Sequence, residues 1–204
     1  MFDFRNANKE QKRAITTTEG PVLITAGPGT GKTFTLVKRA LYLIQEKGVK
    51  PEQIMLVTFT EKAAKELVTR MTNEMEKMGI RANLNEMYVG TFHSICLRII
   101  KENVDFTRLK KNYRMLDGFD QIYTIYQNIF KFSTLEGFGE VVPDKNWWGQ
   151  AKAIAGLVNP LSEELVDADK MMKDKDPKMA TLGNILKTYK KMLSDENMLD
   201  FAAI

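Results

Sequence analysis

The stretch from Val22 to Thr33 has the sequence Val-Leu-Ile-Thr-Ala-Gly-Pro-Gly-Thr-Gly-Lys-Thr, an apolar run followed by a glycine-rich turn that closes on Gly-Lys-Thr. Glycine adopts backbone dihedrals that other residues reach only at a cost, so successive N–H groups in such a turn can curl around a phosphate chain. The pattern therefore predicts a strand over Val22 to Ala26 and a helix from about Gly31 to Gln45, whose N-terminus faces the same anion.

Two side chains at the end of this loop predict a bound nucleotide, ATP or GTP, with Mg²⁺. Lys32 supplies a positive charge for the β and γ phosphates, and the Thr33 hydroxyl is placed to ligate the metal, so we assign the catalytic part of the site to this pair. The loop residues expected to contact the nucleotide are Ala26, Gly27, Pro28, Gly29, Thr30, Gly31, Lys32 and Thr33. In the alternative interpretation the glycines only make a tight turn, and Lys32 is an ordinary surface lysine.

Length and composition allow one or two domains and exclude several classes of protein. The chain of 204 residues has no apolar stretch long enough to span a bilayer, and its N-terminus lacks the features of a signal peptide. We therefore expect a cytoplasmic protein with no membrane partner. The single cysteine, Cys96, excludes an internal disulfide, and the net charge of +4 permits nucleic-acid binding without requiring it.

Three apolar runs in the first half are separated by longer amphipathic segments, which is the rhythm of a parallel sheet with crossover helices. The runs are Val22 to Ala26, Ile54 to Phe59 and Met87 to Gly90. Beyond about Lys111 the β-branched runs disappear, and we predict an all-helical second half. Helices are expected near Gly118 to Lys131, Asp144 to Val158, Ser162 to Lys173 and Lys178 to Leu193, with a turn at Asn159-Pro160.

The segment from Asn8 to Ile15, ahead of the loop, is the first of four strings that together resemble the UvrD/Rep/PcrA-type superfamily 1 DNA helicases. It is similar to the family's Q motif, which implies that the Gln11 amide bonds the adenine edge, since an amide carries both a donor and an acceptor. The alternative for Gln11 is a capping box with Asn8 at the start of a helix. Arg39 matches a family arginine and joins the expected nucleotide contacts.

Two further strings resemble the family's DNA-contacting motifs Ia and Ib. Motif Ia corresponds to Ile54 to Leu67, where the resemblance implies that Phe59 stacks on a base of single-stranded DNA; the alternative makes Phe59 a core residue. Motif Ib corresponds to Val89 to Arg98, which includes the single histidine of the chain. The resemblance implies contacts to the DNA backbone from Thr58, Thr60, Lys62, Thr91 and His93.

The fourth string, Tyr113 to Gln121, resembles the opening of a helical subdomain that the family inserts into its first motor domain. The resemblance implies an α/β fold, with an incomplete RecA-like parallel sheet of a P-loop NTPase and a mostly helical inserted subdomain. It divides the chain into the first part of the ATP-binding domain 1A at 1–111, subdomain 1B at 112–198, and the return into 1A at 199–204. We reject Asp117 as a Mg²⁺-binding Walker B aspartate, because the apolar run before it is too short and Gly118 follows where a catalytic glutamate is expected.

The last residues, Leu199 to Ile204, resemble the segment that precedes the family's motif II, so we expect an apolar helix there and a chain that is part of a longer product. The resemblance implies the N-terminal, ATP-binding and DNA-contacting portion of an ATP-dependent DNA helicase or translocase in repair or replication. Its partners would be single-stranded DNA or a single-strand/double-strand junction, and the rest of the helicase chain with a second RecA-like domain. Without the motif II carboxylates, we expect this portion to be inactive alone.

Two other classes of function stay open on the sequence. One is a P-loop kinase or nucleotide-dependent regulator that does not bind DNA, with Trp147 and Trp148 as the packing core of a helical lid. The other is a nucleic-acid-binding or interaction module that uses the basic residues Arg108, Lys110, Lys111 and Arg114. That basic cluster has its own alternative, a solvated loop.

Overall fold

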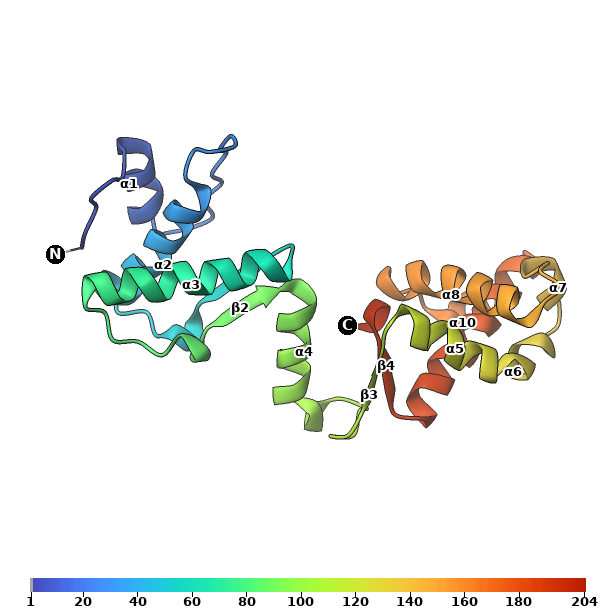
Figure 1. The fold of residues 1–204 in the computed structure, drawn as a ribbon. Coiled ribbons are helices and arrows are strands. Elements are labelled where there is room, and N and C mark those ends of the chain that lie inside the picture. The colour runs from blue at the N-terminus through green and yellow to red at the C-terminus, as the bar shows by residue number, and fades with distance from the viewer. Residues whose placement is uncertain (1) are drawn as a thin grey trace. The chain divides into compact units, whose positions relative to one another are not determined.

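The computed structural model describes residues 2–204 and divides into two compact units, of which the first ends at Cys96 and the second starts at Leu97 (Figure 1). The division falls inside helix α4 (Phe92–Glu102), which belongs to both units. The sequence placed the boundary between domains 1A and 1B later, after residue 111, and that assignment stays a prediction.

The N-terminal unit alternates helices with short strands. In chain order its elements are α1 (Lys9–Thr16), α2 (Lys32–Lys47), a 3₁₀ helix (Pro51–Gln53), β1 (Met55–Thr58), α3 (Glu61–Met78), a second 3₁₀ helix (Leu84–Glu86), β2 (Tyr88–Thr91) and the start of α4. Helix α2 confirms the predicted helix after the glycine-rich loop. Both α2 and α3 stop at glycines in the left-handed conformation, Gly48 and Gly79, where a side chain would be strained.

Strands β1 and β2 pair in parallel, which confirms two of the three predicted strands and the α/β class. Met55 lies opposite Tyr88, and Thr58 lies opposite Thr91 at the carboxyl end. Helix α3 makes the crossover between the strands and packs against both of them. Because the strands are parallel, the residues that follow Thr58 and Thr91 emerge at the same edge of the sheet.

The predicted strand over Val22 to Ala26 is not formed. This segment is irregular, and within residues 2–204 the strand β1 pairs with β2 alone. Its apolar side chains are exposed, with Leu23 exposed to 90% and Ile24 to 47%. A strand is held by the hydrogen bonds of a neighbour, and the β1–β2 pair offers none to this segment, so its apolar sequence alone does not make it a strand.

The core of this unit lies between α2 and α3, which contact each other. The helical periodicity of both segments places their apolar faces inward. The buried residues of the two helices include Val37, Ala40, Leu41, Leu67, Met71 and Met75.

Lys38 is buried in this core with only 3% of its side chain exposed, which its sequence context does not indicate. Its Nζ lies 2.9 Å from Glu74 Oε2 and donates to the Asp3 carbonyl at 3.3 Å. The rings of Phe2 and Phe34 lie within 6 Å of the same nitrogen. The Lys38 hydrogen bond lowers the pKa of Glu74 below its ordinary value. The ion pair therefore joins the N-terminal segment, α2 and α3.

The C-terminal unit is mostly helical, with a small pair of strands. After a 3₁₀ helix (Val104–Phe106) its elements are β3 (Arg114–Leu116), α5 (Gly118–Gln127), α6 (Ile129–Ser133), α7 (Phe138–Val141), α8 (Trp147–Glu163), α9 (Ala168–Met171), α10 (Pro177–Asp195), β4 (Met198–Asp200) and a 3₁₀ helix (Phe201–Ala203). Helices α5, α8 and α10 gather around one core (Figure 1). Its fully buried members include Ile125, Phe132, Ile154, Ile185 and Leu186.

Four local predictions for this unit are wrong. It is not all-helical, because β3 and β4 pair in parallel, with Leu116 opposite Asp200. The apolar helix expected over Leu199 to Ile204 is also not formed, because this segment contains the end of β4 and a 3₁₀ helix. The turn predicted at Asn159-Pro160 is not formed, because Pro160 lies inside α8. Packing of the apolar face of α8 on the core stabilises the helix although proline lacks the N–H donor. The helix predicted over Ser162 to Lys173 is interrupted, because Leu165, at φ +53°, lies between the end of α8 and the start of α9.

Candidate nucleotide and nucleic-acid sites

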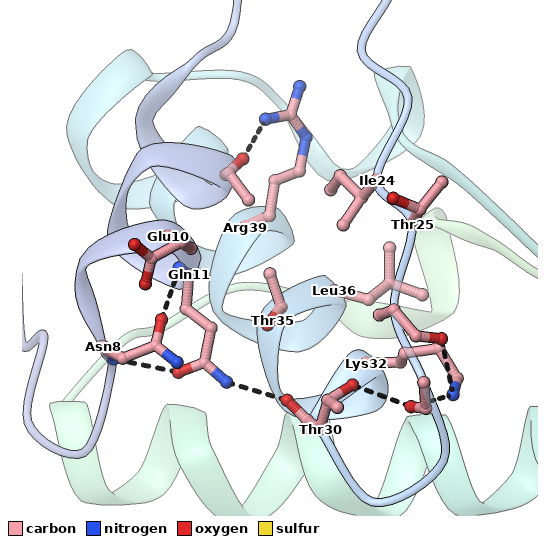
Figure 2. Close-up of a pocket in the computed structure, with 13 residues that line it drawn as sticks. Asn8, Glu10, Gln11, Ile24, Thr25, Thr30, Lys32, Thr35, Leu36 and Arg39 are labelled. Atoms are coloured by element: carbon pink, nitrogen blue, oxygen red, sulfur yellow. Dashed lines mark hydrogen bonds between the residues drawn. The ribbon is translucent and has the colours of Figure 1, made fainter.

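A cavity of about 430 Å³ lies beside the glycine-rich loop, between α1, α2 and the irregular segment before the loop (Figure 2). It is lined by Asn8, Glu10, Gln11, Ala14, Ile24, Thr25, Ala26, Gly27, Thr30, Lys32, Thr35, Leu36 and Arg39. The structure thus brings together residues from the predicted Q motif, the loop and Arg39. Its size falls in the range of small-molecule sites in proteins.

The loop is closed on its own carbonyl groups. Lys32 Nζ donates to the carbonyl oxygens of Gly27 at 2.8 Å and Ala26 at 3.4 Å, and Thr30 Oγ1 donates to the same Gly27 carbonyl at 2.8 Å (Figure 2). An ammonium group bonds more strongly to an anionic oxygen than to a neutral carbonyl. The Lys32 charge is therefore held at the loop, where a phosphate would compete for it.

Two loop glycines have left-handed dihedrals. Gly29 has φ +74° and Gly31 has φ +85°, a region that residues with a Cβ adopt at a cost. A Cβ on Gly31 would also lie 2.8 Å from Gln11 Nε2. The glycines at these positions are therefore required by the shape of the loop and by its contact with α1.

The Gln11 amide makes the capping box and also reaches the loop. Its Oε1 accepts from Asn8 N at 3.0 Å, Asn8 Oδ1 accepts from Gln11 N at 2.8 Å, and Gln11 Nε2 donates to the Thr30 carbonyl at 3.0 Å (Figure 2). The capping-box alternative is thus present. A bond to adenine requires the amide to exchange these partners, and that role stays a prediction.

Arg39 links α2 to the end of α1 on another side of the cavity. Its Nη1 donates to the carbonyl oxygens of Ala14 and Thr17. Sequence analysis missed Thr35 and Leu36, which line the cavity beside it. Their spacing was the available signal, because positions 32, 35, 36 and 39 share one face of a helix.

The residues fit a nucleotide with a divalent cation in the donor groups they offer. Lys32 and the loop N–H groups suit phosphate oxygens, and Thr33, the second residue of α2, carries a hydroxyl next to them. No cluster of three or more histidine, cysteine, aspartate or glutamate side chains suited to a metal ion occurs within residues 2–204.

The residues after β1 and β2 form a second candidate site, which we call the strand-tip surface. It consists of Thr58 at the end of β1 with Phe59, Thr60, Glu61 and Lys62 after it, and of Thr91 at the end of β2 with Phe92 and His93 at the start of α4. Phe59 is 99% exposed, so the alternative that it is a core residue is wrong. Phe92, which sequence analysis did not single out, is 69% exposed; its place beside the predicted Thr91 contact was the signal.

Several hydroxyl groups of this surface already have local partners. Thr58 Oγ1 donates to the Thr60 carbonyl at 3.0 Å, and Thr60 Oγ1 caps α3 by accepting from Ala63 N at 3.2 Å. Thr91 Oγ1 donates to Glu61 Oε1 at 3.0 Å. The two strand tips are therefore joined through a side-chain hydrogen bond.

The structure also places the residues of the C-terminal unit on which the two alternative functions depend. Trp147 is half exposed and packs edge-on to Phe130, so it is not the centre of a core. The basic residues Arg108, Lys110, Lys111 and Arg114 are exposed, and Arg114 pairs with Asp120 at 3.2 Å. Asp117 caps α5 by accepting from Asp120 N.

A buried polar network in the same unit was not foreseen. Gln121 Nε2 lies within hydrogen-bond distance of Asn159 Oδ1, Tyr189 OH and Asp200 Oδ2. The Tyr189 hydroxyl also donates to Asp200 Oδ2. Burial and the neighbouring Asp200 carboxylate raise the pKa of Tyr189 well above its ordinary value. The network joins α5, α8, α10 and β4 and lies apart from both candidate sites in the sequence.

Comparison with known proteins assigns the family. Residues 7–204 match the UvrD/REP helicase N-terminal domain, and the chain belongs to this family. It is 34% identical over 200 residues to the ATP-dependent DNA helicase PcrA of Staphylococcus epidermidis, covering 97% of this chain and 25% of that protein. The PcrA protein of Staphylococcus aureus is 33% identical over 197 residues, covering 95% of this chain and 25% of its own length. The chain thus spans about a quarter of the length of these curated relatives.

The helices of residues 2–204 include none with the length and apolar character that crossing a bilayer requires.

Proposed function

We propose that this chain is the N-terminal, ATP-binding and single-stranded-DNA-contacting portion of an ATP-dependent DNA helicase or translocase in DNA repair or replication. The names of its relatives and its membership of the helicase family support this function. The observation that carries the proposal is the Phe59 ring, 99% exposed at the carboxyl end of β1 and beside the end of β2. An aromatic ring held in water at a strand tip is suited to stacking on a ligand.

On the strand-tip surface, Phe59 would stack on a base, while hydroxyl and cationic groups meet the backbone. Stacking suits a motor that passes along any sequence, because every base has a π face. The backbone contacts in this proposal come from Thr58, Thr60, Lys62, Thr91 and His93. The DNA would be a single strand or a junction between single and double strands.

At the glycine-rich loop, Lys32 would leave the loop carbonyls and bind the β and γ phosphates of ATP. The N–H groups from Gly27 to Thr33 would hold the same phosphates, Gln11 would contact adenine, and Arg39 would border the site. When bound, Mg²⁺ would neutralise phosphate charge, with the Thr33 hydroxyl as its ligand from this chain. GTP would be the alternative nucleotide at this loop.

The domain assignment and the activity of the chain alone belong to the same proposal. Residues 1–111 and 199–204 would belong to a RecA-like domain 1A, and residues 112–198 to subdomain 1B. The rest of the helicase, with motif II and a second RecA-like domain, would be the partner in cis. We expect the 204-residue chain alone to show no appreciable ATP turnover or DNA unwinding, because hydrolysis needs further carboxylates and an arginine.

The DNA part of the proposal is tested by titrating fluorescein-labelled oligothymidylate and measuring anisotropy at two salt concentrations. Phe59→Ala is expected to weaken binding by about 5- to 150-fold, since stacking is worth roughly 1–3 kcal/mol per base. Phe106→Ala is the matched control, because Phe106 is 91% exposed in the other unit. Binding should weaken as salt rises. If the unaltered chain does not bind the oligothymidylate while it still binds nucleotide, the alternative of a nucleotide-dependent regulator is favoured.

The nucleotide part is tested by titrating a fluorescent ATP analogue in the presence of Mg²⁺. Lys32→Ala should abolish the binding that the unaltered chain shows, because it removes the charge held at the loop. Lys47→Ala, at the exposed far end of α2, is the control and should bind as the unaltered chain does. Steady-state ATP turnover that is stimulated by DNA and abolished by Lys32→Ala would refute the expected inactivity of the chain alone.

A further inference from the structure

The strand-tip surface contains a carboxylate among groups proposed to meet phosphates. Glu61 is the first residue of α3, and its Oε1 accepts a hydrogen bond from Thr91 Oγ1 at the end of β2, at 3.0 Å. The two residues are thirty positions apart, and the parallel pairing of Thr58 with Thr91 brings them together. An acidic side chain in the first turn of a helix is stabilised there by the N-terminal dipole.

The single hydroxyl proton of Thr91 is committed within this cluster. Ser94 N donates to Thr91 Oγ1 at 3.2 Å, and Ser94 Oγ donates to the Thr91 carbonyl at 3.0 Å. Ser94 Oγ also lies 3.1 Å from Thr91 Oγ1, but the charged Glu61 oxygen is the stronger acceptor. Because a phosphate oxygen only accepts, Thr91 cannot donate to a nucleic-acid backbone while it bonds Glu61.

We propose that Glu61 sets the affinity of the strand-tip surface for single-stranded nucleic acid, by holding the Thr91 hydroxyl and by repelling phosphate charge. This inference rests on the proposed function, in which DNA occupies that surface. Glu61 is a positioning residue in the first of these actions, because it acts there through Thr91, whereas its charge acts on the phosphates directly. A bound strand has to exchange the Glu61–Thr91 bond for a Thr91–phosphate bond, which weakens binding and favours the release that movement along a strand requires.

The first test compares Glu61→Gln with the unaltered chain in the oligothymidylate titration. We expect Glu61→Gln to bind on the order of 3- to 10-fold more tightly at low salt, with a smaller gain at high salt as phosphate repulsion is screened. Glu66→Gln is the matched control, because Glu66 is exposed on the same helix and makes the same change in net charge. It should alter binding less than about twofold.

The second test separates the hydrogen bond from the charge by a double-mutant cycle. Thr91→Val should change DNA affinity less than about twofold in the unaltered chain, where the hydroxyl already serves Glu61. In the Glu61→Ala background the hydroxyl is released, and Thr91→Val should then weaken binding by several-fold, as expected for a lost bond to a charged group. Additive effects of the two substitutions would overturn the assignment to Thr91.

The outcomes distinguish this inference from the function on which it rests. If the unaltered chain binds through Phe59 but Glu61→Gln binds no more tightly, Glu61 is not an affinity-setting residue and the DNA proposal stands. If neither protein binds, and ATP binding is intact, both proposals are wrong. Far-UV circular dichroism checks that each variant keeps helix α3. If Glu61→Gln is poorly folded, Glu61→Asn replaces it in the test; this variant also removes the charge and should likewise tighten binding.

Discussion

The two units differ in where they place their apolar side chains. The C-terminal unit buries them in a core that includes Ile125, Phe132 and Leu186. Its helices are also joined by the buried hydrogen bonds among Gln121, Tyr189 and Asp200. The N-terminal unit leaves Leu23 and Phe59 in water, next to its glycine-rich loop and at its strand tips. Both units have a packed core, and the C-terminal unit also exposes apolar side chains such as Phe106; in the N-terminal unit, however, exposed apolar side chains lie at the candidate sites, which have to remain open to ligands.

The largest effect predicted by this contrast is a cavity in the C-terminal core. Phe132→Ala should cost about 3–5 kcal/mol of the unfolding free energy, because the ring is fully buried. Both tryptophans, Trp147 and Trp148, lie in this unit, so urea unfolding followed by their fluorescence reports on it. Leu23→Ala, in the N-terminal unit, should change the stability of that unit by less than about 0.5 kcal/mol, measured by hydrogen exchange in α2. A large loss for Leu23→Ala would show that the segment before the loop is packed in solution.

A smaller effect is expected from the buried polar network. Tyr189→Phe should cost about 1.5–3 kcal/mol at neutral pH, because it removes a hydrogen bond to a buried carboxylate. The raised pKa of Tyr189 means that the unfolded chain ionises first, so this stability is present below about pH 10 and is lost at higher pH. Urea titrations between pH 9 and 11 should show a shallower decline for Tyr189→Phe. An identical decline would contradict the assignment.

The Lys38–Glu74 pair predicts a smaller loss in the N-terminal unit. Glu74→Gln should cost about 1–2 kcal/mol, less than a fully buried pair, because the Glu74 side chain is still 22% exposed. The pKa of Glu74 is lowered, so the contribution is present above its ordinary value of 4.5 and lost as the pH falls below it. Hydrogen exchange in α2 and α3 measures this loss. Glu66→Gln, at an exposed pair on α3, is the control.

The smallest effect should come from the exposed pair between Arg114 and Asp120. Asp120→Asn is expected to change the stability of the C-terminal unit by less than about 0.5 kcal/mol, because Arg114 is 59% exposed and the pair is solvated. Tryptophan-monitored urea unfolding measures it. A loss as large as that for Tyr189→Phe would show that surface charges, and not the buried network, close this unit.

Local features were predictable where a short segment contains its own signal. Helix α2 begins at the glycine-rich loop, and β1 and β2 follow the apolar runs that indicated them. The cavity also collects Gln11, Lys32 and Arg39, as the motifs suggested. By contrast, the predicted turn at Asn159-Pro160 is wrong: Pro160 lies inside α8, because packing of this helix on the core outweighs one lost hydrogen bond.

The sequence by itself determined the family, the glycine-rich loop and the order of α2, β1, α3 and β2 in the N-terminal half. Backbone preferences and motif spacing act over a few residues, so they can be recognised without the fold. Only the tertiary structure decided that Val22 to Ala26 lacks a strand partner, that Lys38 is buried, and that Thr91 bonds Glu61. Each of these depends on residues distant in the chain, whose approach is set by packing and not by local sequence.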